Sequence, residues 1–507
     1  MSSKISLIFS CALLLAAPYL LPALFPLAWF AFAPLFWIVV HTDSWRRILL
    51  WGWLAGFFTH LLGFYWLVYT ISVFGEFPYS VSVLVFLIYA ALQGLQMALF
   101  ALLVKRSGFG PLSILPAIFW VAIEFWFPRL FPWYLANSQL PFLTFIQSAD
   151  LVGPYGASFL IMWFNAAAFE AFLSWQLARP IRWNALLLVI LCVLVSVAYG
   201  IFRLQTVTTG AASAAKLNLG AVQGDIDIDL KWNAILVKRN LETYRNLTGQ
   251  VDGSRLVIWP ETAVELWLPE NLAQIPPDVL PPLNAESFFI FGARSYRGHI
   301  GGPDFKAFNT AFLSDGKGRI IGHYHKQVLL AFGEYLPFSA ILSKLPAMPF
   351  ADGFTPGNGP HTLDLPGPIH IAPLICYEDL MPELSRAFVK SGKANILVNL
   401  TNDAWYGRTV APWQHARLAQ WRAIETRRSL VRVTNTGVTS VINPKGEMIQ
   451  SLPLFTAVAF RAEIALMDGE TLYVRFGDWF AWSATLISLA VLLLCRGKRI
   501  GISSHRQ

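Results

Sequence analysis

The sequence predicts two kinds of structure in one chain: an α-helical membrane bundle of about eight transmembrane helices, and an α/β layered domain outside the membrane. The 507 residues are 55% hydrophobic and only 13% charged, whereas soluble domains are near 25% charged. Eight apolar stretches approach the length of about 20 residues that a helix needs to cross a bilayer. Between the seventh and the eighth, short β-branched runs alternate with polar helical stretches, which is typical of an α/β domain.

The apolar stretches are interpreted as spans, with two open points near the N-terminus. The candidate spans are, in chain order, 5–22, 24–40, 47–70, 79–104, 111–129, 156–178, 182–203 and 478–495. Prolines interrupt the first two spans, which could form one tight helical hairpin. The alternative for residues 4–24 is a cleaved signal peptide, and cleavage would leave the charge pattern of the loops unexplained.

Positive charges predict the orientation of the spans. Loops 71–78 and 130–155 contain no lysine or arginine. Basic residues instead lie at the N-terminus, in every second loop and at the C-terminus: Lys4, Arg46, Arg47, Lys105, Arg106, Arg179, Arg182, Arg496, Lys498, Arg499 and Arg506. Since basic loops stay in the cytoplasm, both termini are expected there and residues 204–477 outside. The net charge of +8 is then explained by these flanks and a mildly basic external domain, without a nucleic-acid partner.

The expected domains are a membrane domain of seven helices (1–203), an external catalytic domain (204–477), and a final helix with a cytoplasmic tail (478–507). Residues 204–215 read as a short linker. The strands expected after it are 216–223, 255–259, 287–293, 307–313, 369–376, 394–400 and 430–434, and the helices are 230–249, 380–392 and 411–428. Two Pro- and Leu-rich segments, 264–283 and 335–366, show no clear element.

One cysteine differs from the other three in its surroundings. Cys11, Cys192 and Cys495 lie in apolar spans, where a thiol behaves as a small hydrophobe. Cys376 is alone in the external block, so no disulfide partner exists there, although an oxidising compartment would permit a disulfide. A lone thiol retained in such a compartment indicates use in chemistry.

Three ionisable residues of the external block suit acyl transfer through a thiol. Glu261 and Cys376 end the apolar runs Leu-Val-Ile-Trp-Pro-Glu and Ile-Ala-Pro-Leu-Ile-Cys, and Lys326 ends His-Tyr-His-Lys. A free thiol is only a few per cent thiolate at pH 7, so it needs a base, and a carboxylate can serve. An ammonium group can stabilise the oxyanion that forms on an attacked carbonyl. A glutamate, a lysine and a cysteine occur in most domains, so spacing alone does not establish this triad.

Four motifs in a fixed order carry a resemblance to a known family. They are Trp-Pro-Glu261, the Lys326 segment with Phe-Gly-Glu334-Tyr-Leu-Pro, Cys376-Tyr-Glu378, and Asn402-Asp-Ala-Trp-Tyr-Gly. Together they resemble the nitrilase superfamily, and the whole chain is similar to its membrane branch, the apolipoprotein N-acyltransferases. The resemblance implies an αββα sandwich held outside the bacterial inner membrane by eight helices. Soluble hydrolases of the superfamily usually continue Cys-Tyr-Asp with an arginine two residues later, and Cys-Tyr-Glu-Asp-Leu-Met here favours the acyltransferase branch.

The resemblance also implies roles for single residues. Glu261 resembles the family's general base, Lys326 its oxyanion-stabilising lysine and Cys376 its nucleophile. Glu334 resembles the second glutamate needed near the thiol. Three further residues match supporting positions of the family: Tyr377 and Glu378, which follow the nucleophile, and Trp232, which lies in a substrate-facing segment.

The implied reaction is the last step of lipoprotein maturation. Cys376 would take the sn-1 acyl chain of a phospholipid, phosphatidylethanolamine being the expected donor, as a thioester. The α-amino group of the diacylglyceryl-cysteine of an apolipoprotein would then accept the chain as an amide, in ping-pong order. No cofactor is implied, and the enzyme is expected to be a monomer whose catalytic domain is periplasmic and whose two termini are cytoplasmic.

Two other functions remain open at the level of sequence. One is a membrane-tethered amidase that uses the same triad with water as acceptor, which would release free acid. The other is a transporter or receptor whose external domain only binds a ligand, which would keep its function without the triad.

No metal site is expected. His323 and His325 form a His-x-His pair without a third ligand. Asp225, Asp227 and Asp229 alternate, but the segment lacks the glycine and the distant glutamate of a calcium loop.

Overall fold

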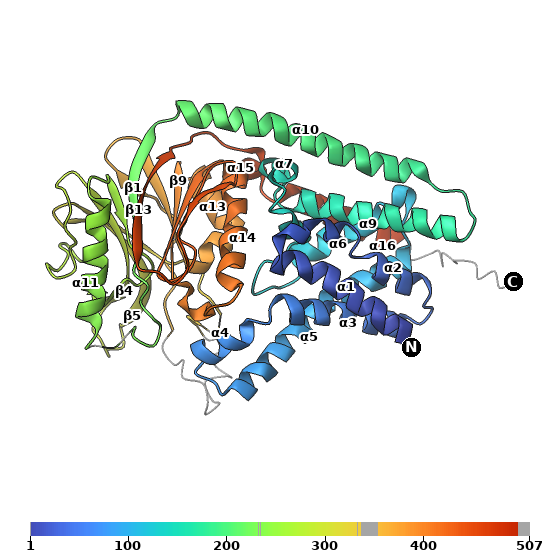
Figure 1. The fold of residues 1–507 in the computed structure, drawn as a ribbon, viewed down its shortest axis with the longest axis horizontal. Helices are drawn as coiled ribbons and strands as arrows, with labels where there is room; N and C mark the ends of the chain where they lie inside the picture. Colours follow the sequence, from blue (N-terminus) through green and yellow to red (C-terminus); the bar gives the residue numbers. More distant parts are fainter. Residues whose placement is uncertain (1, 232, 234, 332, 336–352, 495–507) are drawn as a thin grey trace. The chain divides into compact units, whose positions relative to one another are not determined.

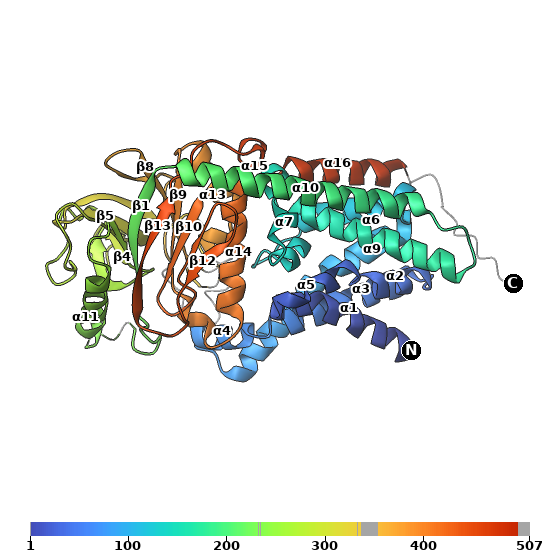
Figure 2. The ribbon, with the colours of Figure 1, turned by 45° about the horizontal axis from the view of Figure 1, so that its top comes forward.

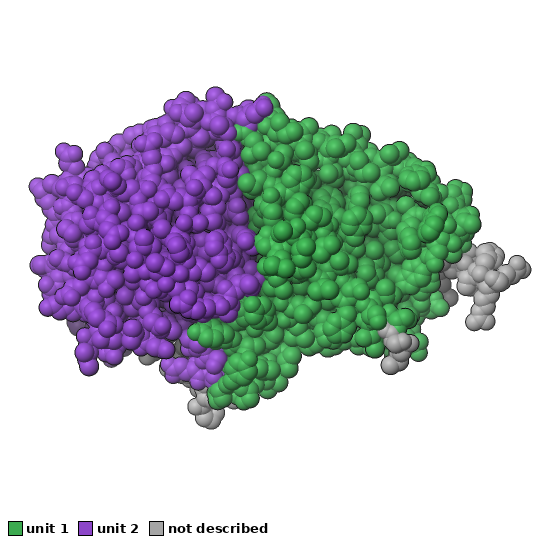
Figure 3. Space-filling model, viewed as in Figure 1, with its two compact units in different colours: residues 1–71, 78–204, 476–507 green, residues 72–77, 205–475 purple. Residues whose placement is uncertain are grey.

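The computed structural model describes residues 2–231, 233, 235–331, 333–335 and 353–494. The chain divides into two compact units, which Figure 3 shows in different colours. Unit 1 comprises residues 1–71, 78–204 and 476–507, and unit 2 comprises residues 72–77 and 205–475. Residues 72–77, which the sequence predicted as part of the membrane domain, therefore belong to the unit that holds the catalytic candidates.

Unit 1 is built from helices (Figure 1). They are α1 (Ser2–Leu20), η1 (Pro22–Trp29), α2 (Ala33–Val40), α3 (Trp45–Gly63), α4 (Leu67–Phe74), α5 (Tyr79–Ser107), η2 (Pro111–Ser113), α6 (Leu115–Trp126), η3 (Leu135–Gln139), α7 (Leu143–Ile146), α8 (Ala149–Val152), α9 (Tyr155–Gln176), α10 (Trp183–Ser213) and α16 (Trp479–Leu494). The last residues of α4 and α10 extend into unit 2.

Apolar helices lie at every place where a span was predicted, but the number of spans stays a prediction. By length and composition, five helical segments of the described chain could cross a membrane, and a sixth if α3 and α4 together form one span. That pair is bent by 67°. The helices at 111–126 and 479–494 are apolar but shorter than a full span within the described residues. Several apolar helices are thus confirmed, whereas the count of eight is not.

The predicted linker at 204–215 is wrong. Helix α10 continues to Ser213, and its last turn is closed by the hydrogen bond from Ala214 N to Gly210 O (3.0 Å). The segment contains no proline, and its alanines favour helix, so the helix of the last apolar stretch has no reason to stop at 203.

Small residues let α3 and α5 pack closely. A Cβ atom placed on Gly52 would lie 2.7 Å from the Met97 carbonyl oxygen, and one on Gly94 would lie 2.8 Å from that of Trp53. Both distances are too short for a side chain, so only glycine allows the two backbones to approach this far. Close contact through glycine is the usual way in which apolar helices associate inside a membrane.

Unit 2 is an α/β domain. After α10 come β1 (Lys216–Gln223), α11 (Val237–Thr248), η4 (Gly249–Val251), β2 (Leu256–Ile258), β3 (Val264–Pro269), β4 (Phe288–Arg297), β5 (Lys306–Asp315), β6 (Ile320–His325), β7 (Leu363–Leu365), β8 (Ile369–Ile375), η5 (Cys376–Leu380), α13 (Pro382–Lys390), β9 (Ile396–Thr401), η6 (Asp403–Tyr406), α14 (Ala411–Thr426), β10 (Ser429–Thr434), β11 (Ser440–Ile442), β12 (Met448–Ser451), β13 (Val458–Ala465) and α15 (Leu472–Phe476).

The strands form two mixed sheets. The first has the order β13-β1-β2-β4-β5-β6, with β3 paired to β4, and the second has the order β12-β11-β10-β9-β8-β7. In the first sheet β1, β2 and β4 run parallel, and in the second β8, β9 and β10 do so. In each sheet antiparallel strands flank this parallel centre.

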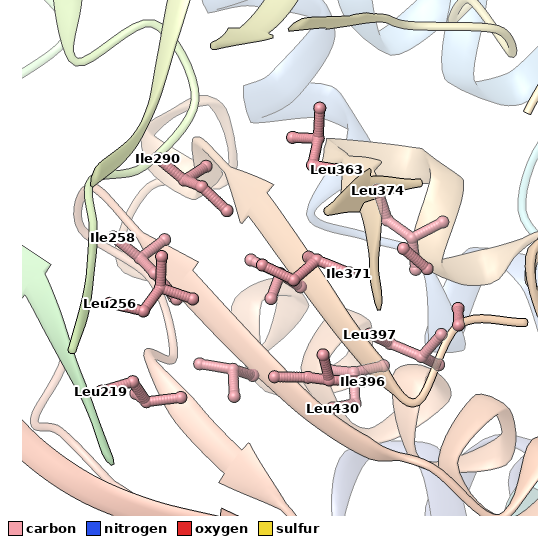
Figure 4. Packing of buried hydrophobic residues seen from close by; sticks show 14 of the residues in the cluster. Leu219, Leu256, Ile258, Ile290, Leu363, Ile371, Leu374, Ile396, Leu397 and Leu430 are labelled. Atoms are coloured by element: carbon pink, nitrogen blue, oxygen red, sulfur yellow. The ribbon is translucent and has the colours of Figure 1, made fainter. Parts of the chain in front are cut away.

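Helices cover the outer faces of both sheets. Figure 1 and Figure 2 show α11 on one side of the strands of unit 2 and α14 on the opposite side. Leucine and isoleucine side chains of both sheets meet in one apolar core, where Leu256 and Ile290 of the first sheet pack with Ile371 and Leu397 of the second (Figure 4). A second core, which includes Tyr244, lies between α11 and the first sheet. The predicted αββα sandwich is confirmed.

The strands that the sequence missed lie at the sheet margins or are short. They are β3, β6, β7, β11, β12 and β13. Segment 264–283, where no element was expected, starts with β3. The predicted helix 230–249 is also too long at its start, since α11 begins at Val237. Central strands such as β9 are buried throughout and read as continuous apolar runs, whereas edge strands are buried on fewer sides and give a weaker apolar signal.

Candidate active site

Glu261 lies just beyond the carboxyl end of β2, in a turn that crosses close over β4. A Cβ atom on Gly292 of β4 would lie 2.6 Å from Glu261 Cα and 2.5 Å from Thr262 N, so this crossing requires glycine. Thr262 has a positive φ of 46°, a backbone conformation that residues other than glycine rarely adopt. The turn therefore holds Glu261, which is 7% exposed, in one defined place at the rim of the first sheet.

Lys326 follows β6 and lies between two glutamates. Its Nζ is 2.6 Å from Glu334 Oε2 and 3.9 Å from Glu261 Oε1. Asn309 of β5 joins the same two carboxylates, because its Nδ2 donates to Glu261 Oε1 (2.7 Å) and to Glu334 Oε1 (3.0 Å). The Leu330 N–H also donates to Glu334 Oε2 (2.9 Å). One ammonium group and one amide thus hold two carboxylates together in a buried place.

Cys376 stands at a sharp turn between β8 and η5. Its φ is +52°, the left-handed region that is strained for any residue other than glycine. The Asn399 side chain of β9 donates to the Cys376 carbonyl oxygen (2.9 Å). Strain that the surroundings maintain at one residue is typical of functional sites, and here the turn places the thiol at the end of a parallel strand.

Glu378 ties the Cys376 turn to the Lys326 segment. One of its oxygens accepts from the backbone N–H groups of Gln327 (2.6 Å) and Val328 (3.0 Å), and the other accepts from Ile375 N (2.8 Å). The Tyr324 hydroxyl donates to the same carboxylate (3.0 Å). The residues directly after Lys326 and directly before Cys376 are therefore bound to one fully buried side chain.

The charges of the site act on one another. Burial raises the pKa of the Cys376 thiol, and the Glu261 carboxylate raises it further, so the thiol is protonated at neutral pH. Burial also raises the pKa of Glu261, against the opposing effect of Lys326. Burial alone would lower the pKa of Lys326, but the negative charges of Glu334 and Glu261 outweigh it and keep Lys326 protonated. A thiol in this state can act as a nucleophile only if a base takes its proton, and the Lys326 ammonium group stays charged at neutral pH.

Comparisons with known proteins identify the family. The model of the apolipoprotein N-acyltransferase N-terminal domain matches residues 11–167, and that of carbon-nitrogen hydrolases matches residues 218–471. Apolipoprotein N-acyltransferase of Geobacter metallireducens is 33% identical to this chain, and the alignment covers 97% of this chain and 95% of that protein. The chain belongs to the apolipoprotein N-acyltransferase family. Its resemblance to this family, inferred from the four motifs, is confirmed.

Further relatives carry the same family name. Apolipoprotein N-acyltransferase of Azotobacter vinelandii is 33% identical over 88% of this chain and 86% of its own length. That of Bdellovibrio bacteriovorus is 31% identical over 92% and 89%. Among solved structures, a mutant of the Nesterenkonia AN1 amidase from the nitrilase superfamily is 18% identical, with a TM-score of 0.34, covering 54% of this chain and 97% of its own.

The structure brings together most of the residues that the sequence predicted for the active site. Glu261, Lys326 and Glu334 are in direct contact, and the Cys376 turn is joined to them through Glu378. Tyr377, which directly follows Cys376, is buried. Trp232 lies outside the described residues.

Two residues of the site were not predicted. Asn309 sits in a strand whose pattern shows only burial, so nothing in the sequence marks its amide as a bridge. Buried Lys231 precedes the predicted Trp232, and its Nζ donates to Thr262 Oγ1 (3.1 Å) and to the Glu261 carbonyl oxygen (3.4 Å). Burial lowers the pKa of Lys231 to about 8.

Glu378 should make the stability of this acyltransferase family member depend on pH. Burial raises the pKa of Glu378 from 4.5 to about 7, although the N–H groups of Ile375 and Val328 oppose this shift. A raised pKa means that the folded state favours the protonated carboxyl group. The protonated Glu378 carboxyl group therefore stabilises the folded state fully below pH 4.5. This stabilisation of about 3 kcal/mol is lost as the pH rises through 7.

We therefore expect Glu378→Gln to flatten the change in Tm between pH 5 and pH 8. Glu383→Gln, on the exposed side of α13, is the control and should retain the wild-type change. An equally steep loss of Tm in the Glu378→Gln protein would contradict the prediction.

Proposed function

We propose that this chain transfers the sn-1 acyl chain of a phospholipid, by way of a Cys376 thioester, to the α-amino group of the diacylglyceryl-cysteine of apolipoproteins. The observation that carries the proposal is the buried Lys326 between Glu261 and Glu334, joined through Glu378 to the strained Cys376 turn. Membership of the apolipoprotein N-acyltransferase family supports the choice of a lipid donor and a lipoprotein acceptor.

In the first step, the Cys376 sulfur attacks the ester carbonyl carbon of the phospholipid while Glu261 takes the thiol proton. The carbonyl oxygen becomes an oxyanion, which the Lys326 ammonium group stabilises. Donors of this kind contribute roughly 3–4 kcal/mol each to transition-state stabilisation in a well-studied case. The carbon–oxygen bond then breaks, Glu261 returns its proton to the leaving alkoxide, and the lysophospholipid departs as an alcohol.

In the second step, the amine of the apolipoprotein attacks the thioester. Glu261 takes a proton from the attacking amine, Lys326 again stabilises the oxyanion, and the carbon–sulfur bond breaks. The Cys376 thiolate then recovers a proton from Glu261. The thioester carries the acyl chain between the two half-reactions, and the lysophospholipid leaves before the amine attacks, which is the basis of the proposed ping-pong order.

Glu334 and Asn309 act through the other groups. Glu334 lies 2.6 Å from the Lys326 ammonium group and helps to keep it charged. Asn309 donates to both carboxylates, so it limits how far they can move apart as the base gains and loses a proton. These two residues therefore position the base and the oxyanion-stabilising cation, and we assign them no bond-making role.

The proposal includes the place and the donor of the reaction. The basic residues of alternate loops support cytoplasmic termini and a catalytic unit on the periplasmic side of the inner membrane. Phosphatidylethanolamine is the donor we propose, and the enzyme is taken to act as a monomer.

Intact-mass spectrometry tests this function. Purified protein incubated with a phosphatidylethanolamine of defined chains should gain one acyl group, and peptide mapping should place it on Cys376. Adding a diacylglyceryl-cysteine peptide should discharge the enzyme and yield an N-acylated peptide. Free fatty acid formed at the same rate without the peptide would favour the amidase alternative, and no adduct at any time would refute the thioester route.

A further inference from the structure

A buried cluster of four charged residues lies outside the proposed catalytic group. We call Asp379, Asp403, His415 and Arg432 the charged clamp. Its members come from four elements, η5, η6, α14 and β10, and each is at most 5% exposed. The proposed reaction uses none of them, and buried charges require an explanation because desolvation costs several kcal/mol per ion.

His415 is held between two carboxylates. Its Nδ1 lies 2.9 Å from Asp403 Oδ1, and its Nε2 lies 2.9 Å from Asp379 Oδ1. A neutral imidazole carries one N–H and could donate to only one of them, whereas an imidazolium donates to both. This geometry favours the protonated form.

Arg432 completes the clamp. Its Nε lies 3.1 Å from Asp379 Oδ2, and one terminal nitrogen lies 3.0 Å from Asp403 Oδ2. With His415 protonated, two positive charges meet two negative charges. A second Arg432 nitrogen is 2.6 Å from His415 Nδ1, so the arginine charge opposes protonation of the imidazole while the two aspartates favour it.

The clamp is connected to the nucleophile through η5. Asp379 is three residues after Cys376 in this single short helix. The next residue is held as well, because Arg422 of α14 donates to the Leu380 carbonyl oxygen (2.7 Å). On the other side, Asp403 packs so closely on Gly437 that a Cβ atom there would lie 2.1 Å from Asp403 Oδ2. The clamp can therefore move little without moving the Cys376 turn.

We propose that the charged clamp positions the Cys376 turn, with His415 as the cation whose charge holds Asp379 and therefore the strained nucleophile in place. This inference rests on the proposed role of Cys376. It assigns positioning residues that act through Asp379, and it predicts that the Cys376 thiol reacts more slowly when His415 loses its charge.

The pH dependence follows from the groups that face His415, namely Asp379, Asp403, Arg432 and Tyr406, whose ring meets the imidazole edge-on. Burial and Arg432 lower the pKa of His415, but the two aspartates outweigh them and raise it above 6.5. A raised histidine pKa gives a stabilisation that is complete below pH 6.5 and is lost as pH rises through the folded value. The clamp should thus loosen as the pH rises through the pKa of His415.

The test uses His415→Gln in the full-length protein, with two readouts. The first is the rate at which iodoacetamide alkylates Cys376, followed by peptide mass spectrometry. The second is single-turnover thioester formation with phosphatidylethanolamine. We expect both rates to fall about 10- to 100-fold at pH 7, since small displacements of a reacting group cost this much. The KM for the phospholipid should not change. His370→Gln is the matched control, because His370 also pairs with an aspartate, Asp364, but is partly exposed.

The double variant Asp379→Asn/His415→Gln should be alkylated at least tenfold faster than His415→Gln alone, because removing the aspartate charge restores the charge balance. The inference would be overturned if the loss of alkylation rate in the double variant equalled the product of the two single losses. It would also be overturned by a His415→Gln protein with wild-type rates. If His415→Gln fails to fold, the single variant Asp379→Asn tests the inference. The Cys376 thiol of this variant should begin to lose reactivity at lower pH than that of the wild type, and an unchanged pH dependence of alkylation would overturn the inference. Since alkylation needs no lipid, a wild-type protein that forms no thioester would refute the proposed function separately.

Discussion

Cys376→Ser should abolish both acyl-enzyme formation and acyl transfer, with a loss of at least about 10⁴-fold. The serine hydroxyl occupies nearly the same volume as the thiol, so the strained turn and the Glu378 hydrogen bonds should persist. A hydroxyl group is far less acidic than a thiol, and Glu261 is too weak a base to activate it. Intact-mass measurement after incubation with phosphatidylethanolamine should show the unmodified protein only.

Cys192→Ser is the control for this experiment. Cys192 lies in the apolar helix α10, and the same substitution there should leave acyl transfer at the wild-type rate. If the Cys376→Ser protein transferred acyl chains normally, Cys376 would not be the nucleophile. An oxygen ester that accumulates on the substituted hydroxyl group would instead show that the turn still directs attack, but that the second half-reaction requires sulfur.

Lys326→Met should reduce the single-turnover acylation rate by roughly 10²- to 10³-fold. It should also destabilise unit 2 by about 3–5 kcal/mol, because removing the cation leaves buried Glu261 and Glu334 facing each other without compensation. Methionine keeps most of the volume of lysine, so the effect can be assigned to the charge. Stopped-flow acylation and thermal unfolding measure the two effects in the same sample.

The double variant Lys326→Met/Glu334→Gln separates catalysis from stability. Removing one carboxylate relieves the uncompensated charge, so most of the lost Tm should return. The acylation rate should remain low, since no ammonium group is restored. A double variant that recovers both would mean that Lys326 only holds the site together, and that the oxyanion is stabilised by other groups.

The apolar helices and the central strands could be predicted from the local sequence. A run of about 20 apolar residues avoids water wherever the rest of the chain lies, so the apolar helices could be located without a structure. The same holds for central strands such as β9, which is apolar because it is buried on both faces. Edge strands such as β12 alternate between partly buried and exposed residues, and they were missed.

The candidate site was only partly readable from the sequence. Glu261 and Cys376 were recognised because each ends an apolar run abruptly, and Lys326 because its segment matches a family motif. Asn309 could not be found in this way, since an asparagine in a buried strand has many possible partners. Its contacts with Glu261 and Glu334 depend on the pairing of β5 with β6 and on the course of the chain after Lys326.

The sequence alone determined where the chain is apolar, which ionisable residues stand at strand ends, and to which family the chain is related. Only the tertiary structure decided that Cys376 occupies a left-handed turn, and that η5, η6, α14 and β10 bring two aspartates, a histidine and an arginine into one buried cluster. The physical reason is the distance along the chain between the groups involved. The hydropathy of each residue is its own property, whereas hydrogen bonds and ion pairs form only where groups that are distant in the chain come together.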